Sequence, residues 1–284
     1  MHRRQFVLST GALVLLALPA GPAIAASATR RLRFSLALSN PGGEALGTQQ
    51  FLCYLPANLE RGQKLRSVEL AAQHTLQTDR LGHNWLELKL DSFPPYGRKQ
   101  LGLTVTVDMA DGSMPSPAGQ PGEWLRTERY IETGHPAIQV LAQQLKAATA
   151  LATAREIFEW VRDNLNYAGY LSDDYGALYA LEHRRGDCTE YAQLVAALAR
   201  ASGIPSRVLG GYVAPRDMAP VPGDYHNWAE LYIDGAWRVV DAQKQAWLEP
   251  AGDYVGFRIC SDTPVNALGL AHRFAVRGSL RAEL

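Results

Sequence analysis

The first third of the chain alternates apolar and polar residues with a period of two. Apolar side chains occupy every second position from Leu32 to Leu38, and the same alternation returns over residues 86–90 and 101–107. Strands with this pattern bury one face and leave the other in water. Turn-forming stretches, NPGG and FPPYG among them, separate the apolar runs. We therefore expect residues 30–108 to form a small antiparallel β-sandwich.

The pattern changes after this region. Residues 108–122 are rich in Pro, Gly and Ser and have no apolar period, which is typical of a linker. Apolar residues then recur every three to four positions, as in amphipathic helices. This period predicts a short helix after Pro136, a second helix over residues 153–167, and a third that starts near Cys188.

Three apolar runs follow the third helix and predict strands over residues 206–213, 226–233 and 237–242. Helices followed by a run of strands indicate an α+β layout. We therefore expect a second domain over residues 123–284, of α+β class, with its core at about residues 150–250.

Residues 1–25 have the composition of an export signal. A paired arginine, Arg3-Arg4, precedes a moderately apolar run, and the small-residue site Ala23-Ile24-Ala25 follows it. The order RRQFV resembles a twin-arginine signal, which implies a bacterial source, folding before export and a periplasmic or secreted product. A retained membrane anchor is the alternative, but such an anchor needs about 20 apolar residues. We expect no membrane span after the signal is removed.

Charge and cysteine content narrow the classes of function. The 28 Lys and Arg residues balance 28 Asp and Glu residues, so we expect neither nucleic acid nor an anionic membrane as a partner. The three cysteines, Cys53, Cys188 and Cys260, match no zinc or redox spacing. A disulfide between Cys53 and Cys260 stays open at this point. Zincin, nucleotide-binding and α/β-hydrolase motifs are absent, so we expect no metal and no cofactor.

Cys188 stands at the start of a predicted helix, just after Asp187, which is placed to cap it. Unpaired N–H groups at a helix start stabilise a thiolate, lower the pKa of a cysteine and can hold an oxyanion. The alternative is structural, because free cysteine is among the most buried residue types. The position alone does not decide between a nucleophile and a core residue.

A predicted hairpin supplies a base for this thiol. Asp234-Gly235 is a strong two-residue turn, and it pairs Ile233 with Ala236. This register sets His226 diagonal to Asp241 on one face of the sheet, where diagonal neighbours are about 7–8 Å apart. An imidazole oriented by a carboxylate, together with a cysteine at a helix start, is the arrangement of an activated sulfur nucleophile.

Two stretches, RRGDCTEYAQLVAALARASGIPSRVLGGYV and HNWAELYIDGAWRVVDAQ, resemble the core of the transglutaminase-like superfamily, a circularly rearranged relative of papain-like cysteine peptidases. In that family a G-x-C-x-x-x-A stretch begins the nucleophile helix, an H-x-W-x-E strand supplies the base, and an Asp closes the next strand. The matching residues here are Gly186, Cys188, Ala192, His226, Trp228, Glu230 and Asp241.

The resemblance implies a papain-like fold, with a helix bearing Cys188 packed on an antiparallel sheet, and a catalytic triad of Cys188, His226 and Asp241. It implies an exported enzyme that attacks amides through an acyl-enzyme thioester, and we favour hydrolysis, as in a cysteine peptidase or amidase. Two alternatives stay open: transfer of the acyl group to an amine, as in transglutaminase cross-linking, and an inactive binding module of the cell envelope. The expected partner is a protein or peptide substrate. Three sources of it stay open: an envelope protein, a peptidoglycan stem peptide and an imported peptide.

Three further residues are weaker candidates for the site. Tyr167 precedes the nucleophile helix and is a candidate second oxyanion donor, with structural packing as the alternative. Trp228 and Glu230 share the predicted face of His226 and are candidates for the wall of the site.

Overall fold

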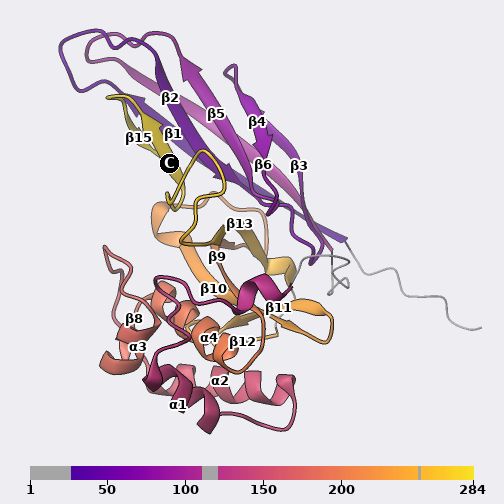
Figure 1. Ribbon diagram of the computed structural model, residues 1–284. Helices are drawn as coiled ribbons and strands as arrows, with labels where there is room; N and C mark the ends of the chain where they lie inside the picture. Colours follow the sequence, from indigo (N-terminus) through magenta and orange to yellow (C-terminus); the bar gives the residue numbers. More distant parts are fainter. Residues whose placement is uncertain (1–26, 111–120, 249–250) are drawn as a thin grey trace, which may run out of the picture.

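The computed structural model describes residues 27–110, 121–248 and 251–284. It has an upper half of strands and a lower half in which four α-helices cover one side of a sheet (Figure 1). The expected signal at residues 1–25 and most of the expected linker at residues 108–122 lie outside the described residues. No helix in the described part is long and apolar enough to cross a bilayer.

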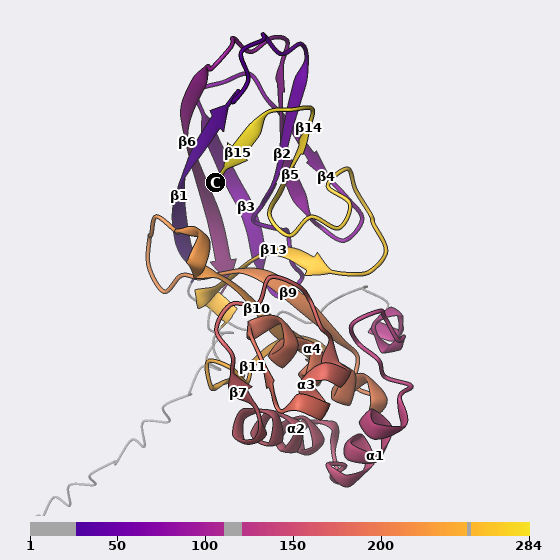
Figure 2. The ribbon, with the colours of Figure 1, turned by 90° about the vertical axis from the view of Figure 1, so that its left-hand side faces the viewer.

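The upper half is an antiparallel β-sandwich, as the period-two pattern predicts. One sheet has the order β15-β1-β6-β3 and the other the order β14-β2-β5-β4. The two sheets face each other in Figure 2. Their apolar faces meet in one core that includes Leu32, Phe51 and Val105. The strands are β1 Ser27–Ser39, β2 Gln49–Leu55, β3 Gln63–Leu70, β4 Thr75–Thr78, β5 Asn84–Leu90, β6 Arg98–Ala110, β14 Phe274–Arg277 and β15 Arg281–Glu283.

The last two strands of the chain belong to this sandwich. β14 pairs with β2, with Phe274 opposite Cys53, and β15 pairs with β1, with Ser39 opposite Arg281. The expected second domain, residues 123–284, therefore contains two strands of the sandwich as well as the core. These strands are short, four and three residues, so they leave almost no periodic signal in the sequence.

The lower half is built on a five-stranded antiparallel sheet of order β12-β11-β10-β9-β13. The three strands expected from the sequence are its centre, and β13 joins them from outside the expected core. The strands of the lower half are β7 Asn166–Tyr167, β8 Arg185–Gly186, β9 Ser206–Val213, β10 Tyr225–Ile233, β11 Ala236–Asp241, β12 Ala246–Trp247 and β13 Tyr254–Cys260. β7 and β8 form a separate parallel pair.

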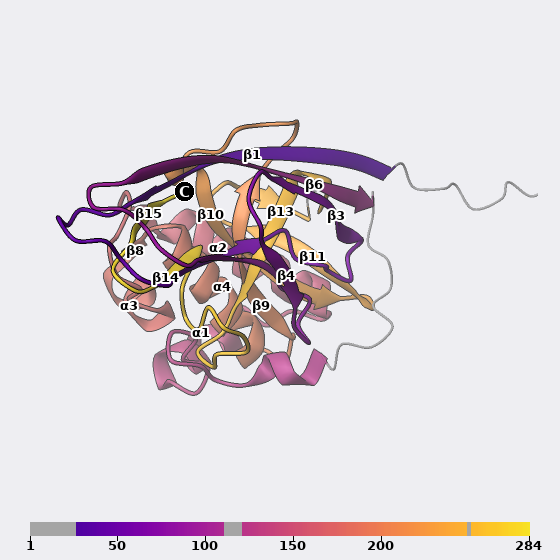
Figure 3. The ribbon, with the colours of Figure 1, turned by 90° about the horizontal axis from the view of Figure 1, so that it is seen from above.

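Four helices pack on one face of this sheet: α1 Pro136–Gln144, α2 Ala150–Asn164, α3 Ala177–His183 and α4 Cys188–Ala201. The first, second and fourth follow the predicted periods, whereas α3 has no counterpart among the predictions. α4 lies at the centre, and nearly all of its side chains are buried, because the other helices surround it and the sheet lies beneath it. Seen from above, the sandwich strands cross over this helical layer (Figure 3).

The two faces of the five-stranded sheet have different partners. Ala229, Leu231 and Ile233 of β10 pack in the same cluster as α4. Trp228, the neighbour of Ala229, belongs to a second cluster on the far face, together with Trp237 and Tyr254. Because side chains alternate along a strand, His226 shares the far face with Trp228.

Buried ion pairs join the sandwich to the five-stranded sheet. Glu230 of β10 is fully buried and pairs with Arg207 of β9 at 2.9 Å and with Arg61 at 2.7 Å. Arg61 precedes β3 of the sandwich, and the adjacent Glu60 pairs with Arg207 at 3.2 Å. Since a buried charge is costly without a partner, this cluster holds the two halves in one relative position.

The three cysteines are free, so the Cys53 to Cys260 disulfide that the sequence leaves open is absent. Cys53 is buried in the sandwich core, and burial raises the pKa of its thiol to about 12. Burial also raises the pKa of Cys260. Both are therefore thiols, not thiolates, at neutral pH.

Replacement of Glu230 by Gln tests the buried ion pairs. The variant leaves Arg61 without its carboxylate partner, so we expect its free energy of unfolding to fall by about 3–5 kcal/mol in urea denaturation. Glu60→Gln is the matched control: its side chain is 34% exposed and its loss is expected to stay below about 1 kcal/mol. If both variants lose the same free energy of unfolding, the buried pairs of Glu230 are not what holds the sandwich to the five-stranded sheet.

Candidate active site

The start of α4 is closed by a reciprocal cap. The carboxylate of Asp187 accepts the backbone N–H of Thr189 at 2.7 Å, and the carboxylate of Glu190 accepts the backbone N–H of Asp187 at 2.9 Å. Asp187 therefore caps the helix as its sequence position predicts. The cap sets Cys188 at the first helical position, where backbone N–H groups have no partner inside the helix.

The same two carboxylates hold the loop that runs between β7 and α3. Asp187 accepts the N–H of Leu171 at 3.0 Å with its second oxygen, and Glu190 accepts the N–H of Tyr175 at 3.0 Å. A side chain at Gly186 would put its Cβ 2.4 Å from the Cβ of Glu190, so only glycine fits there. The order Gly-Asp-Cys thus has a steric and a hydrogen-bonding cause.

His226 and Asp241 meet as the hairpin register predicts. β10 and β11 pair with Ile233 opposite Ala236, and both turn residues, Asp234 and Gly235, have positive φ angles of 52° and 76°. The Nε2 atom of His226 is 2.6 Å from a carboxylate oxygen of Asp241. Since Asp241 engages Nε2, the other ring nitrogen, Nδ1, is left to face a proton donor.

Further contacts fix this pair. The hydroxyl of Tyr254 donates to the same Asp241 oxygen at 3.1 Å, and the N–H of Lys244 donates to the other oxygen at 3.0 Å. The indole of Trp228 stacks on the His226 ring with 6.2 Å between ring centres. Tyr254 lies on β13, beyond the expected core, so sequence reasoning missed its role as a second orienting partner.

The thiol of Cys188 reaches the start of β10. Although α4 packs on the face opposite to His226, its first residue lies at the end of the strand, and the backbone N–H of Asn227 donates a hydrogen bond to the Cys188 sulfur. The side chain of Asn227 donates to the hydroxyl of Thr189 at 3.0 Å, which ties the strand to the helix start. The structure thus brings Cys188 to the residue that follows His226. Asn227 carried no sequence signal beyond its position between His226 and Trp228.

Burial governs the protonation of the thiol. Desolvation, followed by the negative charge of Asp187, raises the pKa of Cys188 to about 12, while the Asn227 N–H and the Thr189 hydroxyl act in the opposite direction. A helix start alone was expected to lower this pKa, and here the loss of water and the adjacent carboxylate are stronger. At neutral pH Cys188 is therefore a neutral thiol.

The thiol opens into a cleft of about 730 Å³. Tyr130, Asn227 and the 170–174 loop line it, as do Pro222 and His272. Tyr167 also lines it and is 57% exposed, next to Cys188, as an oxyanion donor would be. Trp228 and Glu230 are fully buried and lie outside the cleft: Trp228 supports the His226 ring, and Glu230 belongs to the ion pairs between the two halves.

Among the residues that the structure describes, no group of three or more His, Cys, Asp and Glu side chains is arranged to hold a metal ion. The polar groups around Cys188 instead bond to one another and to the backbone.

Comparison with known proteins identifies the core. Residues 139–242 match the family model of the transglutaminase-like superfamily. An uncharacterised protein of Mycobacterium leprae is 34% identical over 83 residues, which is 28% of this chain and 30% of that protein. The chain therefore spans less than a third of that relative.

Solved structures extend the similarity to the whole fold. A candidate cysteine protease from Cytophaga hutchinsonii has a TM-score of 0.62 at 20% identity, covering 91% of this chain and 90% of that one. The periplasmic domain of TgpA from Pseudomonas aeruginosa has a TM-score of 0.43 at 19% identity, covering 73% and 72%. The Cytophaga structure shares the α+β fold over almost the full length of the chain.

The raised pKa of Glu190 predicts that the free energy of unfolding depends on pH. Burial raises the pKa of its carboxyl to about 7 against an ordinary value of 4.5, so the folded state holds the proton more tightly than the unfolded state. This contribution to stability is complete below about pH 4.5 and is lost as pH rises through about 7. Gln cannot ionise, so we expect Glu190→Gln to gain about 1–3 kcal/mol relative to wild type between pH 5 and pH 8, measured by urea unfolding.

The matched control is Glu182→Gln, an exposed position on α3. It should change the free energy of unfolding by less than about 0.5 kcal/mol at either pH. A difference between Glu190→Gln and wild type that does not vary with pH would contradict the assignment.

Proposed function

We propose that the chain, whose residues 139–242 match the family model of the transglutaminase-like superfamily, is a thiol-dependent acyl-transfer enzyme, a cysteine peptidase or amidase. The observation that carries the proposal is the buried His226–Asp241 contact of 2.6 Å at the strand start that also receives the thiol of Cys188. An oriented imidazole beside a cysteine at a helix start supports nucleophilic catalysis.

In the proposed reaction His226 acts as a general base. Its Nδ1 takes the proton of Cys188 as the sulfur attacks the carbonyl carbon of an amide, and Asp241 stabilises the imidazolium through Nε2. The imidazolium then protonates the leaving amine, the C–N bond breaks, and a thioester stays on Cys188. A water molecule, deprotonated by His226, attacks the thioester and releases a carboxylic acid and the thiol.

The raised pKa of Cys188 favours this order of steps over a mechanism in which Cys188 and His226 form a thiolate–imidazolium pair before the substrate binds. Because burial and Asp187 oppose a thiolate, the proton leaves the sulfur only when His226 accepts it. The oxyanion formed during attack needs donors close to the sulfur. The N–H of Cys188 at the helix start and the hydroxyl of Tyr167 are the groups that we assign to this task.

We further propose that the enzyme acts in the periplasm or after secretion, on protein or peptide amides of the cell envelope. The twin-arginine pattern at residues 1–25 supports export. We prefer hydrolysis to amine transfer because the solved structure with the same fold, from Cytophaga hutchinsonii, is described as a candidate cysteine protease.

Replacement of Cys188 by Ala removes the nucleophile. We expect kcat/KM on a peptide library to fall by at least about 10³-fold and labelling by iodoacetamide at pH 7 to disappear, as read by peptide mass spectrometry. Cys53 and Cys260 are internal controls, because their pKa values are raised as that of Cys188 is, but both lie on strands and not at a helix start. Undiminished cleavage by Cys188→Ala, or labelling that moves to Cys53 or Cys260, would overturn the proposal.

The pH profile of labelling tests the role of His226. Below a pKa of about 12 the thiolate fraction rises about tenfold per pH unit, so in His226→Ala the rate at Cys188 should climb steeply from pH 6 to pH 10. In wild type, proton transfer to His226 should make the rate level off near neutral pH. Steep profiles in both proteins would show that Cys188 is an ordinary buried thiol, as expected of an inactive binding module.

A further inference from the structure

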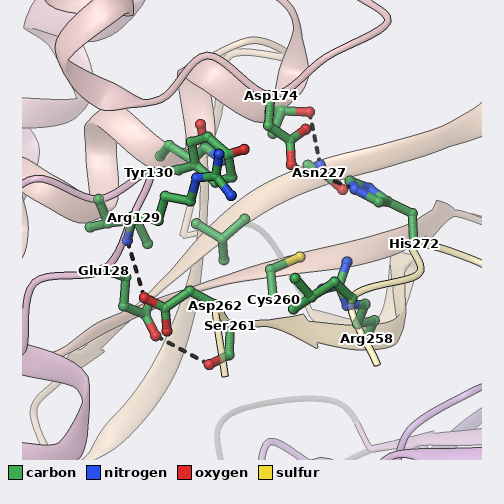
Figure 4. Close-up of a pocket in the computed structure, with 15 residues that line it drawn as sticks. Glu128, Arg129, Tyr130, Asp174, Asn227, Arg258, Cys260, Ser261, Asp262 and His272 are labelled. Atoms are coloured by element: carbon green, nitrogen blue, oxygen red, sulfur yellow. Dashed lines mark hydrogen bonds and ion pairs between the residues drawn. The ribbon is translucent and has the colours of Figure 1, made fainter. Parts of the chain in front are cut away.

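A second pocket adjoins the cleft that contains Cys188. Its volume is about 260 Å³, and Tyr130, Asp174, Thr189, Asn227 and His272 line both spaces. Figure 4 shows Asn227 and His272 at one side of this pocket and Arg258 beside the Cys260 sulfur, below them. Pockets for whole drug-sized ligands have volumes of about 300–1,000 Å³, so this one suits a single amino-acid residue of a longer substrate.

Arg258 on β13 lies in this pocket without a carboxylate of the described residues in direct contact, and the charge of Asp174 acts on it only through space. The residue is only 6% exposed, yet within the described ranges of the chain its guanidinium forms no hydrogen bond and no ion pair. Native proteins almost always pair a buried charge. The register of β13 shifts between Gly256 and Arg258, and Arg258 then stands opposite Gly210, where the Tyr225 hydroxyl and Oδ1 of Asn227 take the space that a Cβ would need. The strand therefore places a charged side chain among neutral polar groups and gives it no carboxylate in direct contact within the described part of the chain.

The carboxylates near this pocket are engaged elsewhere. Glu128 pairs with Arg126 at 2.8 Å and with Arg200 at 3.0 Å. Asp262 accepts the backbone N–H of Arg129 at 3.1 Å. Asp174 lies 3.5 Å from the Nε2 of His272, at the boundary with the cleft. Among the described residues none of these carboxylates forms an ion pair with Arg258, although the negative charge of Asp174 favours its charged form.

Two amide oxygens in the pocket also lack partners. Oε1 of Gln193, on α4, and Oδ1 of Asn227 are buried and accept no hydrogen bond among the described residues. Both side chains line the pocket. A peptide brings N–H donors for such oxygens, whereas a simple inorganic anion does not.

We propose that this pocket is a specificity subsite that takes a substrate carboxylate on Arg258 while peptide N–H groups bond to Gln193 and Asn227. This subsite rests on the proposed function. It narrows the substrate class to peptides with a carboxylate near the scissile amide. The guanidinium fork matches the two oxygens of a carboxylate. Two sources share this chemistry: an acidic side chain and the free carboxylate at a peptide C-terminus.

Equilibrium binding tests the subsite without relying on catalysis. The full chain carrying Cys188→Ala is titrated by calorimetry with acetyl-Ala-Glu-Ala-amide, its Gln counterpart, and acetyl-Ala-Gln-Ala with a free C-terminus. We expect one of the two carboxylate peptides to bind about 10- to 100-fold more tightly than the neutral peptide, and the one that does identifies the source. Equal affinities for all three peptides would overturn the subsite, whatever the outcome of the cleavage assays.

Arg258→Gln, placed in the same Cys188→Ala chain, should abolish this preference and leave the affinity for the neutral peptide within about threefold. The matched control is Arg129→Gln, an exposed arginine of the same pocket, which should keep the preference because its charge is screened by water.

Thermal unfolding separates a subsite from a structural arginine. Loss of an unpaired buried charge should leave the melting temperature of Arg258→Gln equal to or above that of its parent. A lower melting temperature together with an unchanged preference would overturn the assignment, as would a preference that survives in Arg258→Gln.

Discussion

Two carboxylates, Asp187 and Glu190, determine where the reactive thiol stands. Each accepts N–H groups both from the helix start and from the loop before α3, so the helix, the thiol and one wall of the cleft move as one unit. Because the carboxylates lie side by side and are withdrawn from water, the pKa of Glu190 is raised to about 7. Asp187, which helps to maintain the geometry of the site, therefore also disfavours a thiolate at Cys188. In the proposed reaction His226 resolves this conflict by accepting the proton only as the sulfur attacks.

The sequence predicted the parts of the site that lie on one continuous pattern. The Asp234-Gly235 turn fixes a two-residue loop, and strict alternation then determines that His226 and Asp241 share a face. The capping role of Asp187 could also be predicted, because a short acidic side chain just before an apolar helical stripe has few other roles. In each case local geometry and the final fold agree, so no tertiary information is needed.

The parts that sequence reasoning missed come from tertiary packing. Tyr254 and Arg258 lie on β13, which joins the sheet next to β9 although more than 40 residues of chain separate their starts. Nothing local indicates that pairing. The pKa of Cys188 was expected to fall at a helix start, but that expectation counted the backbone dipoles and left out desolvation, which only the folded environment reveals. α3 has seven residues, too few to show a clear helical period in the sequence. Packing against α4 stabilises it, and that contact exists only in the folded protein.

The pairing of β15 with β1 joins the last described strand of the chain to the first. β1 and β2 are synthesised before the five-stranded sheet, but the edges that β15 and β14 cover stay open until residues 274–283 have been made. The sandwich therefore completes its sheets only after the segment that carries Cys188 and His226 is available to fold. A chain cut short near its end would expose two unpaired strand edges, which are the features that chaperones and proteases recognise. Closure of both sheets therefore depends on residues 274–283, which lie outside the core that carries Cys188 and His226.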